Sequence, residues 1–166
     1  MANNEFDKFL GEREARQNQL RNAEEVVVQG AAAEWQNLKD ATKALTLGKT
    51  VEGNRLEWKP YSAYYSDFLQ LKNVAAIFID RGTRNGAPQA CSIRFDRNAS
   101  VPQGVFLEDK SPVPTEVWSL EPRAEGQSVI WHVKELGKSF TSTELASKVA
   151  IRLVEHFETY EAAFGR

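Results

Sequence analysis

Three residues of this 166-residue sequence have side chains suited to acid–base catalysis, namely His132, Asp96 and Arg94. They lie in segments 88–97 and 129–134, whose alternating apolar residues are typical of β-strands. Because neighbouring side chains of a strand point to opposite faces, all three are predicted on the face away from the apolar core. A histidine near acidic and basic groups can transfer protons. An antiparallel sheet also exposes such a mixed polar face to water, so the same residues fit a solvated surface.

A cysteine nucleophile would need Cys91 within hydrogen-bond reach of His132. Alternation places Cys91 on the apolar face and His132 on the other, so we expect Cys91 to be a small core residue. A single cysteine also excludes an internal disulfide and a multi-cysteine zinc site. With only His132 and His156 as imidazole ligands, we expect no metal site and no cofactor.

Two Gly-Lys-Thr/Ser triplets, at 48–50 and 137–139, resemble the end of a phosphate-binding loop. Such a loop needs another glycine five residues before its second glycine, and those positions hold Lys43 and His132. The backbone amides that would cradle a phosphate are therefore not encoded. Both triplets are predicted to be turns.

An aromatic group follows the first predicted strand and consists of Trp58, Tyr61, Tyr64 and Tyr65. Tyrosine and tryptophan combine a large apolar surface with a polar tip, which suits a ligand pocket or a partner surface. The alternative is that these aromatic side chains form a small hydrophobic core beneath a loop.

The composition indicates one folded domain rather than a nucleic-acid-binding or membrane protein. Hydrophobic residues make up 42% of the chain, and the formal net charge is -2, so the basic surface of a DNA or RNA binder is not expected. No run of 18 apolar residues occurs, and the N-terminus lacks the basic and apolar segments of a signal peptide. We expect a cytoplasmic protein that binds neither nucleic acid nor a membrane.

Residues 5–46 contain no proline and many helix formers, which predicts one long helix or two helices broken near Gly30. About 42 residues at 1.5 Å rise span roughly 63 Å, whereas a compact domain of the remaining length is about 35 Å across. Either the helix folds back near Gly30 or its overhang binds a partner, most simply a second copy of the chain. A heptad seam supplies the interface candidates, which are Leu20, Val27, Ala31 and Leu38.

Turn residues at 48–54 separate an N-terminal helical arm, 1–47, from an α+β body, 48–166. The body is predicted to hold five strands, at 56–59, 68–81, 88–97, 117–121 and 129–134.

Side-chain parity predicts the register of the two hairpins. A three-residue loop ending at Gly86 would place Ile77 opposite Ile93, with Gly86 left-handed in a bulged turn. The second hairpin would pair Trp118 with Trp131.

A capping box, Thr141 and Glu144, predicts the start of a C-terminal amphipathic helix. The predicted fold is therefore α+β, with a long N-terminal helix, a five-stranded antiparallel sheet and a C-terminal helix on one sheet face. The other face needs a cover as well, either residues 26–45 of the first helix or a second subunit.

This element order resembles that of the class I chaperones of type III secretion, which are small, acidic, dimeric proteins built from helix and sheet. The resemblance is one of topology. The first helix is longer here, and a proline-rich stretch at 98–115 stands where those chaperones have a middle helix. No residue role is carried over from it.

These observations predict a non-catalytic protein–protein interaction module, chaperone- or adaptor-like, that self-associates as a homodimer. The excess helix length and the lack of a complete catalytic set favour this hypothesis. The alternative is a small-molecule-binding domain or enzyme with an aromatic-lined pocket between the sheet and the last helix. Its polar contacts would come from the acid–base candidates or from the tyrosines.

Overall fold

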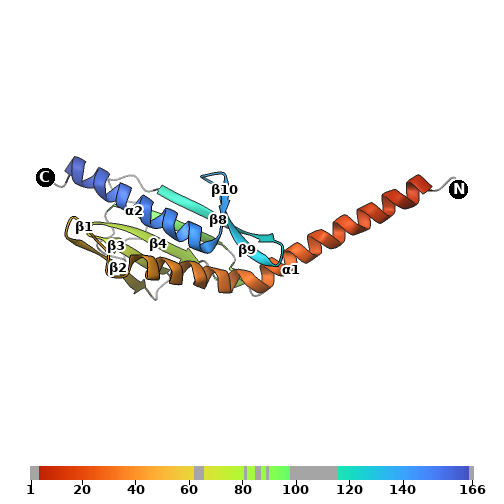
Figure 1. The fold of residues 1–166 in the computed structure, drawn as a ribbon, viewed down its shortest axis with the longest axis horizontal. Coiled ribbons are helices and arrows are strands. Elements are labelled where there is room, and N and C mark those ends of the chain that lie inside the picture. Colours follow the sequence, from red (N-terminus) through yellow and green to blue (C-terminus); the bar gives the residue numbers. More distant parts are fainter. Residues whose placement is uncertain are drawn as a thin grey trace.

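The computed structural model describes residues 4–61, 66–80, 82–84, 87–88, 90–97 and 116–164. It confirms an α+β fold in which two helices lie against an antiparallel sheet (Figure 1). Helix α1 (Asn4–Thr46) opens the chain and helix α2 (Ser142–Phe164) closes it.

The sheet has eight strands, whereas the sequence predicted five. Their order is β1-β2-β3-β4-β7-β8-β9-β10, so each strand pairs with the next one along this series, antiparallel throughout. Their bounds are β1 (Thr50–Val51), β2 (Asn54–Tyr61), β3 (Ser66–Leu71), β4 (Val74–Asp80), β7 (Cys91–Asp96), β8 (Glu116–Glu125), β9 (Ser128–Val133) and β10 (Lys138–Phe140). A separate hairpin pairs β5 (Thr83–Arg84) with β6 (Ala87–Pro88).

The predicted strand 68–81 is in fact two strands, because Leu71 of β3 pairs with Val74 of β4 across a two-residue turn. Lys72 in this turn is left-handed, with a φ of 54°. Residues other than glycine seldom adopt that conformation, so nothing in the sequence marks the turn. The remaining extra strands, β1 and β10, are only two and three residues long.

Both helices cover the same face of the sheet, which corrects the prediction that residues 26–45 would cover the opposite face. Trp35 and Leu38 of α1 share one hydrophobic core with Leu145 and Leu153 of α2. The two helices also contact each other directly (Figure 1). The predicted position of the C-terminal helix on one sheet face is confirmed.

Helix α1 runs through Gly30 without interruption, so of the two predicted alternatives the single long helix is correct. A Cβ atom added at Gly30 would lie 3.0 Å from Cγ2 of Val129 in β9. The glycine therefore allows the helix to approach the sheet closely instead of ending the helix.

The two halves of α1 differ completely in burial. Residues 4–22, which we call the arm, are all exposed, whereas the buried residues of the helix lie between Ala31 and Thr46. Figure 1 shows the arm projecting past the end of the sheet. The second half of α1 is part of the core. The segment that projects from the body is therefore shorter than the helical arm, 1–47, that the sequence predicted.

The β4–β7 pairing differs from the predicted register by one residue. Phe78, not Ile77, pairs with Ile93 and faces the helices. Arg84 pairs with Ala87, which leaves a two-residue connection in place of the predicted three residues. The predicted left-handed Gly86 lies outside the described residues. The register was mispredicted because β4 is buried on both faces, so its apolar pattern does not distinguish them.

The β8–β9 hairpin also differs from its predicted register. Pro122 pairs with Trp131, so the predicted pair of Trp118 with Trp131 does not form. The prediction ended the strand before Pro122, but β7 pairs with β8 only as far as Leu120. Beyond that residue β8 is bonded to β9 alone, and a proline is tolerated on such an edge.

Two leucines of α1 provide a matched test of the difference in burial between the arm and the second half of the helix. Leu38 is 0% exposed and Leu20 is 65% exposed. We expect Leu38→Ala to lower the free energy of unfolding by about 2–5 kcal/mol, because it leaves a cavity in the core. Leu20→Ala should change it by no more than about 0.5 kcal/mol. Urea unfolding followed by tryptophan fluorescence measures both, and equal losses would contradict a free arm.

Candidate functional site

The three acid–base candidates do not assemble into one site. Arg94 and Asp96 lie together on the sheet face opposite the helices, with the guanidinium Nη2 3.6 Å from the Asp96 Oδ2. His132 Nδ1 instead lies 3.0 Å from the hydroxyl of Ser139 in β10. Arg94 pairs with Val117 and His132 with Glu121, which is four residues further along β8. At a rise of about 3.3 Å per residue the two groups are about 13 Å apart along the strand.

The sheet face that carries Arg94 and Asp96 also carries a second buried apolar cluster, formed by Phe68, Ala75 and Ile77. Asp96 itself is buried. A partly apolar face was predicted here, but the register error assigned Ile77 to the other side of the sheet.

Cys91 lies on the helix-covered face, as predicted, and does not contact His132. The side chain is 5% exposed. Burial, together with the nearby Asp80 carboxylate, raises the pKa of its thiol to about 12. A protonated, buried thiol is a poor nucleophile, which agrees with the predicted role of a small core residue.

Among the aromatic candidates, only the side chain of Trp58 lies within the described residues. Its ring packs on Phe78 with centroids 5.0 Å apart, and Lys43 Nζ lies 5.4 Å from the ring centroid. The side chain of Tyr61, and residues 64 and 65, lie outside the described part of the chain. Trp58 is thus a half-buried part of the core edge.

A buried polar cluster that the sequence analysis missed joins α2 to the sheet. His156 Nε2 lies 2.9 Å from Oε2 of Glu116 in β8, and Arg152 Nε donates to the same oxygen at 2.6 Å. The His156 ring stacks on Phe95 at 5.4 Å. Arg97 Nε donates to His156 Nδ1 at 3.4 Å. Arg152 and His156 are four residues apart and therefore lie on the same side of α2, which is the sequence feature that could have indicated that they act together.

His156 is only 5% exposed, so its side chain lies between α2 and the sheet and not on the helix surface. Burial is the largest effect and lowers the pKa of His156, assisted by the positive charges of Arg152 and Arg97, although the hydrogen bond and the charge of Glu116 act to raise it. Burial alone would raise the pKa of Glu116, but hydrogen bonds from Arg152 and His156 lower it overall. At neutral pH, therefore, a neutral imidazole donates through Nε2 and accepts through Nδ1, while Arg152 balances the carboxylate.

This cluster joins α2 to the sheet, and its members Glu116 and Arg152 also line one of the grooves beside α2. Each nitrogen of His156 already has a partner, and the Glu116 carboxylate is shared between two donors. A substrate would have to displace these bonds. In the described part of the chain, no group of three potential metal ligands occurs.

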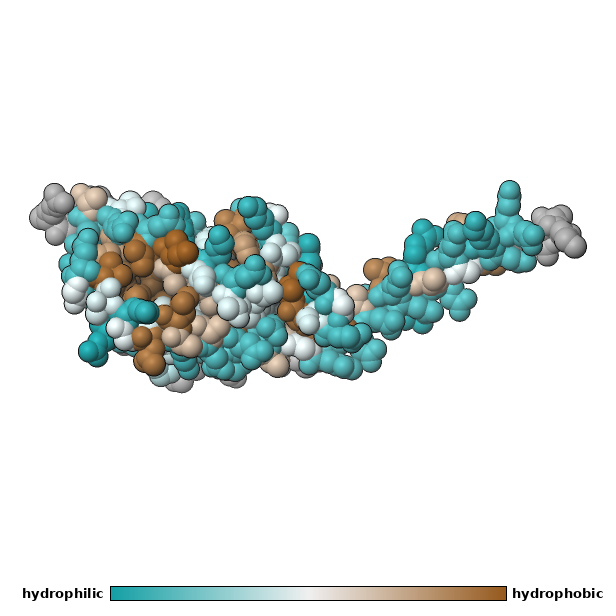
Figure 2. All heavy atoms as spheres, in the orientation of Figure 1, coloured by the Kyte–Doolittle hydropathy of each residue, from teal (hydrophilic) through white to brown (hydrophobic). Residues whose placement is uncertain are grey.

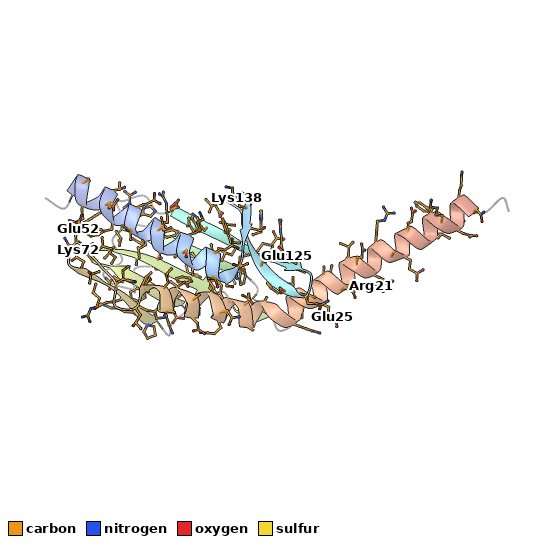
Figure 3. The ribbon with its side chains drawn as sticks, in the orientation of Figure 1. Arg21, Glu25, Glu52, Lys72, Glu125 and Lys138 are labelled. Carbon is orange, nitrogen blue, oxygen red and sulfur yellow. The ribbon has the colours of Figure 1, made fainter. Side chains whose placement is uncertain are left out.

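The interface candidates lie in different environments along α1. Ala31 and Leu38 are buried in the core of their own chain, Val27 is half-buried, and Leu20 is exposed. Arg21 and Glu25 mark the region where α1 leaves the body (Figure 3). Of these four candidates, Leu20 and Val27 therefore offer surface to a partner.

Two grooves flank α2. The first has a volume of about 520 Å³ and lies between α1 and α2, where Leu45 faces Ala150 and Val154. The second has a volume of about 500 Å³ and has a mixed lining that includes Lys148 and Glu155. Figure 2 shows apolar residues gathered on the surface of the body over α1 and α2, whereas most of the arm surface is polar.

Comparisons with protein families, with curated proteins and with solved structures find no match to this chain. No helix in the described residues is both long enough and apolar enough to cross a bilayer.

The buried histidine predicts a stability that depends on pH. Because the folded chain lowers the pKa of His156, the unfolded chain binds a proton more readily as the pH falls below about 6.5. Acidification through this range therefore favours unfolding. The lowered pKa of Glu116 acts in the same direction but only below about pH 4.5.

We expect the melting temperature to fall between about pH 7.5 and about pH 5.5, and to fall less in His156→Gln. At the higher pH the variant should be less stable by about 1–3 kcal/mol, since Glu116 loses a buried partner. His132→Gln, which removes the other histidine, is the matched control. Equal pH dependence in the wild type and His156→Gln would show that another group causes the effect.

Proposed function

We propose that this protein is a non-catalytic interaction module, chaperone- or adaptor-like, that self-associates through its arm and binds a protein partner in the cytoplasm. The observation that carries the proposal is the arm. It is a regular helix with every residue exposed, yet it presents four large apolar side chains, Phe6, Phe9, Leu10 and Leu20.

These four side chains lie on one side of the helix. At about 100° per residue they fall within an arc of about 100°. The same arc contains Trp35 and Leu38, the α1 residues that pack on the sheet. The apolar side that is buried in the body therefore continues into the arm without a cover. A second copy of the chain supplies such a cover with the fewest assumptions, because one two-fold axis serves both arms.

The remaining chemistry of the described residues supports a binding role. The pair of Arg94 and Asp96, the pair of His132 and Ser139 and the buried Cys91 lie apart from one another.

The alternative of an aromatic ligand pocket finds little support in the helix–sheet layer. Trp35 packs edge-on against Phe78 and Trp131, with centroids 6.1 and 5.8 Å away. Phe95 and Trp118 pack edge-to-face at 4.8 Å. The rings of Trp35, Phe78, Phe95 and Trp131 are buried in the core between the helices and the sheet, whereas Trp118 also lines the groove of about 500 Å³ beside α2.

The test is the absolute mass in solution of the full chain and of a variant lacking residues 2–22. We expect the full chain at twice its 18.7 kDa mass and the shortened chain as a folded monomer, because the deleted residues are exposed. A full-length variant with Phe6, Phe9 and Leu10 changed to serine controls for helix length and should also be monomeric. A monomeric wild type would overturn the proposal.

Deletion up to Thr50 would be an unsuitable version of this test. It also removes Trp35 and Leu38, so loss of the core would be mistaken for loss of assembly. Circular dichroism of each variant should therefore accompany the light-scattering measurement.

A further inference from the structure

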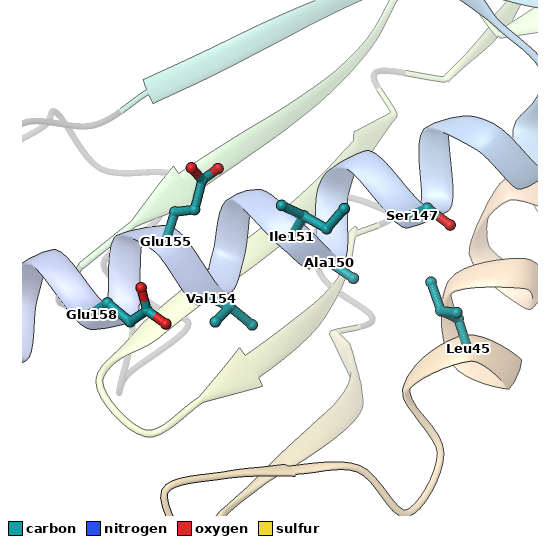
Figure 4. A pocket seen from close by; sticks show the side chains of 7 residues that line it. All are labelled: Leu45, Ser147, Ala150, Ile151, Val154, Glu155 and Glu158. Atoms are coloured by element: carbon teal, nitrogen blue, oxygen red, sulfur yellow. The ribbon is translucent and has the colours of Figure 1, made fainter.

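The groove between α1 and α2 has the form of a helix-binding site. The two helices are linked where Ser142 Oγ donates to Glu34 Oε1 at 2.6 Å. Toward their C-terminal ends a groove of about 520 Å³ opens between them. Figure 4 shows Ala150 and Val154 on the side of α2 that faces Leu45. At the groove, Ile151 is 56% exposed and Leu45 41% exposed.

The arm carries a side-chain pattern that fits such a groove. Phe6, Phe9, Leu10 and Arg13 occupy positions i, i+3, i+4 and i+7, the spacing by which a helix anchors in an apolar groove. The arm cannot reach the groove of its own chain, because α1 is one continuous helix.

We propose that the arm of each copy lies in the groove of a second copy, with the two α1 helices antiparallel. The inference rests on the proposed self-association and names its contact. In this arrangement Leu10 meets the partner's Leu45, and the two-fold axis falls midway between them, near Val27 and Val28. Val28 is itself an exposed apolar residue, so the axis lies where two copies can bury it.

Pairing of the two arms with each other is the main competing arrangement. An antiparallel pair of arms would bring Leu10 to the partner's Leu20 and would centre on Ala15. Residues 11–19 contain no large apolar side chain, so the middle of that interface would be polar.

Disulfide trapping distinguishes the two arrangements. Full-length Leu10→Cys is mixed with full-length Leu45→Cys, and in a parallel sample with Leu20→Cys, before mild oxidation and peptide mass analysis. We expect the first mixture to give a disulfide between positions 10 and 45 and the second to give little product. Cys91 is buried, with a pKa of about 12, so the wild type should form no disulfide.

A dimer that gives the 10–20 disulfide instead would overturn the groove and leave self-association standing. A monomer by light scattering would overturn the proposed function itself, so the two failures are distinguishable.

Substitution of the groove provides a second readout. Because Ile151 is exposed in the single chain, Ile151→Ser should leave the fold intact and raise the dimer dissociation constant about tenfold or more. Val117→Ser changes an exposed apolar residue on the other sheet face and should leave the dissociation constant unchanged. Sedimentation equilibrium measures both, and equal effects would contradict the groove as the contact.

Discussion

The packing of Trp35 and Leu38 between the sheet and α2 is the interaction on which the rest of the structure depends. Both side chains are buried, and the Trp35 ring lies against one ring from β4 and one from β9. A second link ties the helices to the sheet, since Trp131 Nε1 donates to Ser142 Oγ, which donates to Glu34. Because α1 is a single helix, fixing its second half in the core also fixes the direction of the arm.

Burial of both helices on one sheet face has a consequence for the polar groups of that face. Glu116 and Asp67 point toward the helices and would be left without partners if the helices supplied only apolar residues. Arg152 and His156 of α2 bond Glu116, and Lys39 of α1 lies 2.8 Å from Asp67. The helix positions are therefore specified by polar partners as well as by apolar contact, because an unpaired buried carboxylate is costly.

The sequence predicts the elements with strong local signals and fails where the outcome depends on packing. The capping box of α2 forms as predicted, with Thr141 N bonded to Glu144 Oε1 and Glu144 N bonded to Thr141 Oγ1. The fold class and the two long helices are local properties of this kind. Strand register is different, because Phe78 and Ile77 are both apolar and only tertiary packing decides which one faces α1. Likewise, nothing near His156 in the sequence shows that Phe95 and Glu116 will bury it.

The edges of the sheet bear on how copies of this chain can associate. The edge strands β1 and β10 are two and three residues long, and the part of β2 beyond β1 carries Pro60, Glu57 and Lys59. Short edges, proline and charge all discourage the addition of a further strand. Self-association through an extended sheet is thereby disfavoured, which leaves the helical surface as the route. On that surface the arm and the α1–α2 groove are both apolar, both uncovered and both present in every copy, so a two-fold exchange covers each with the other.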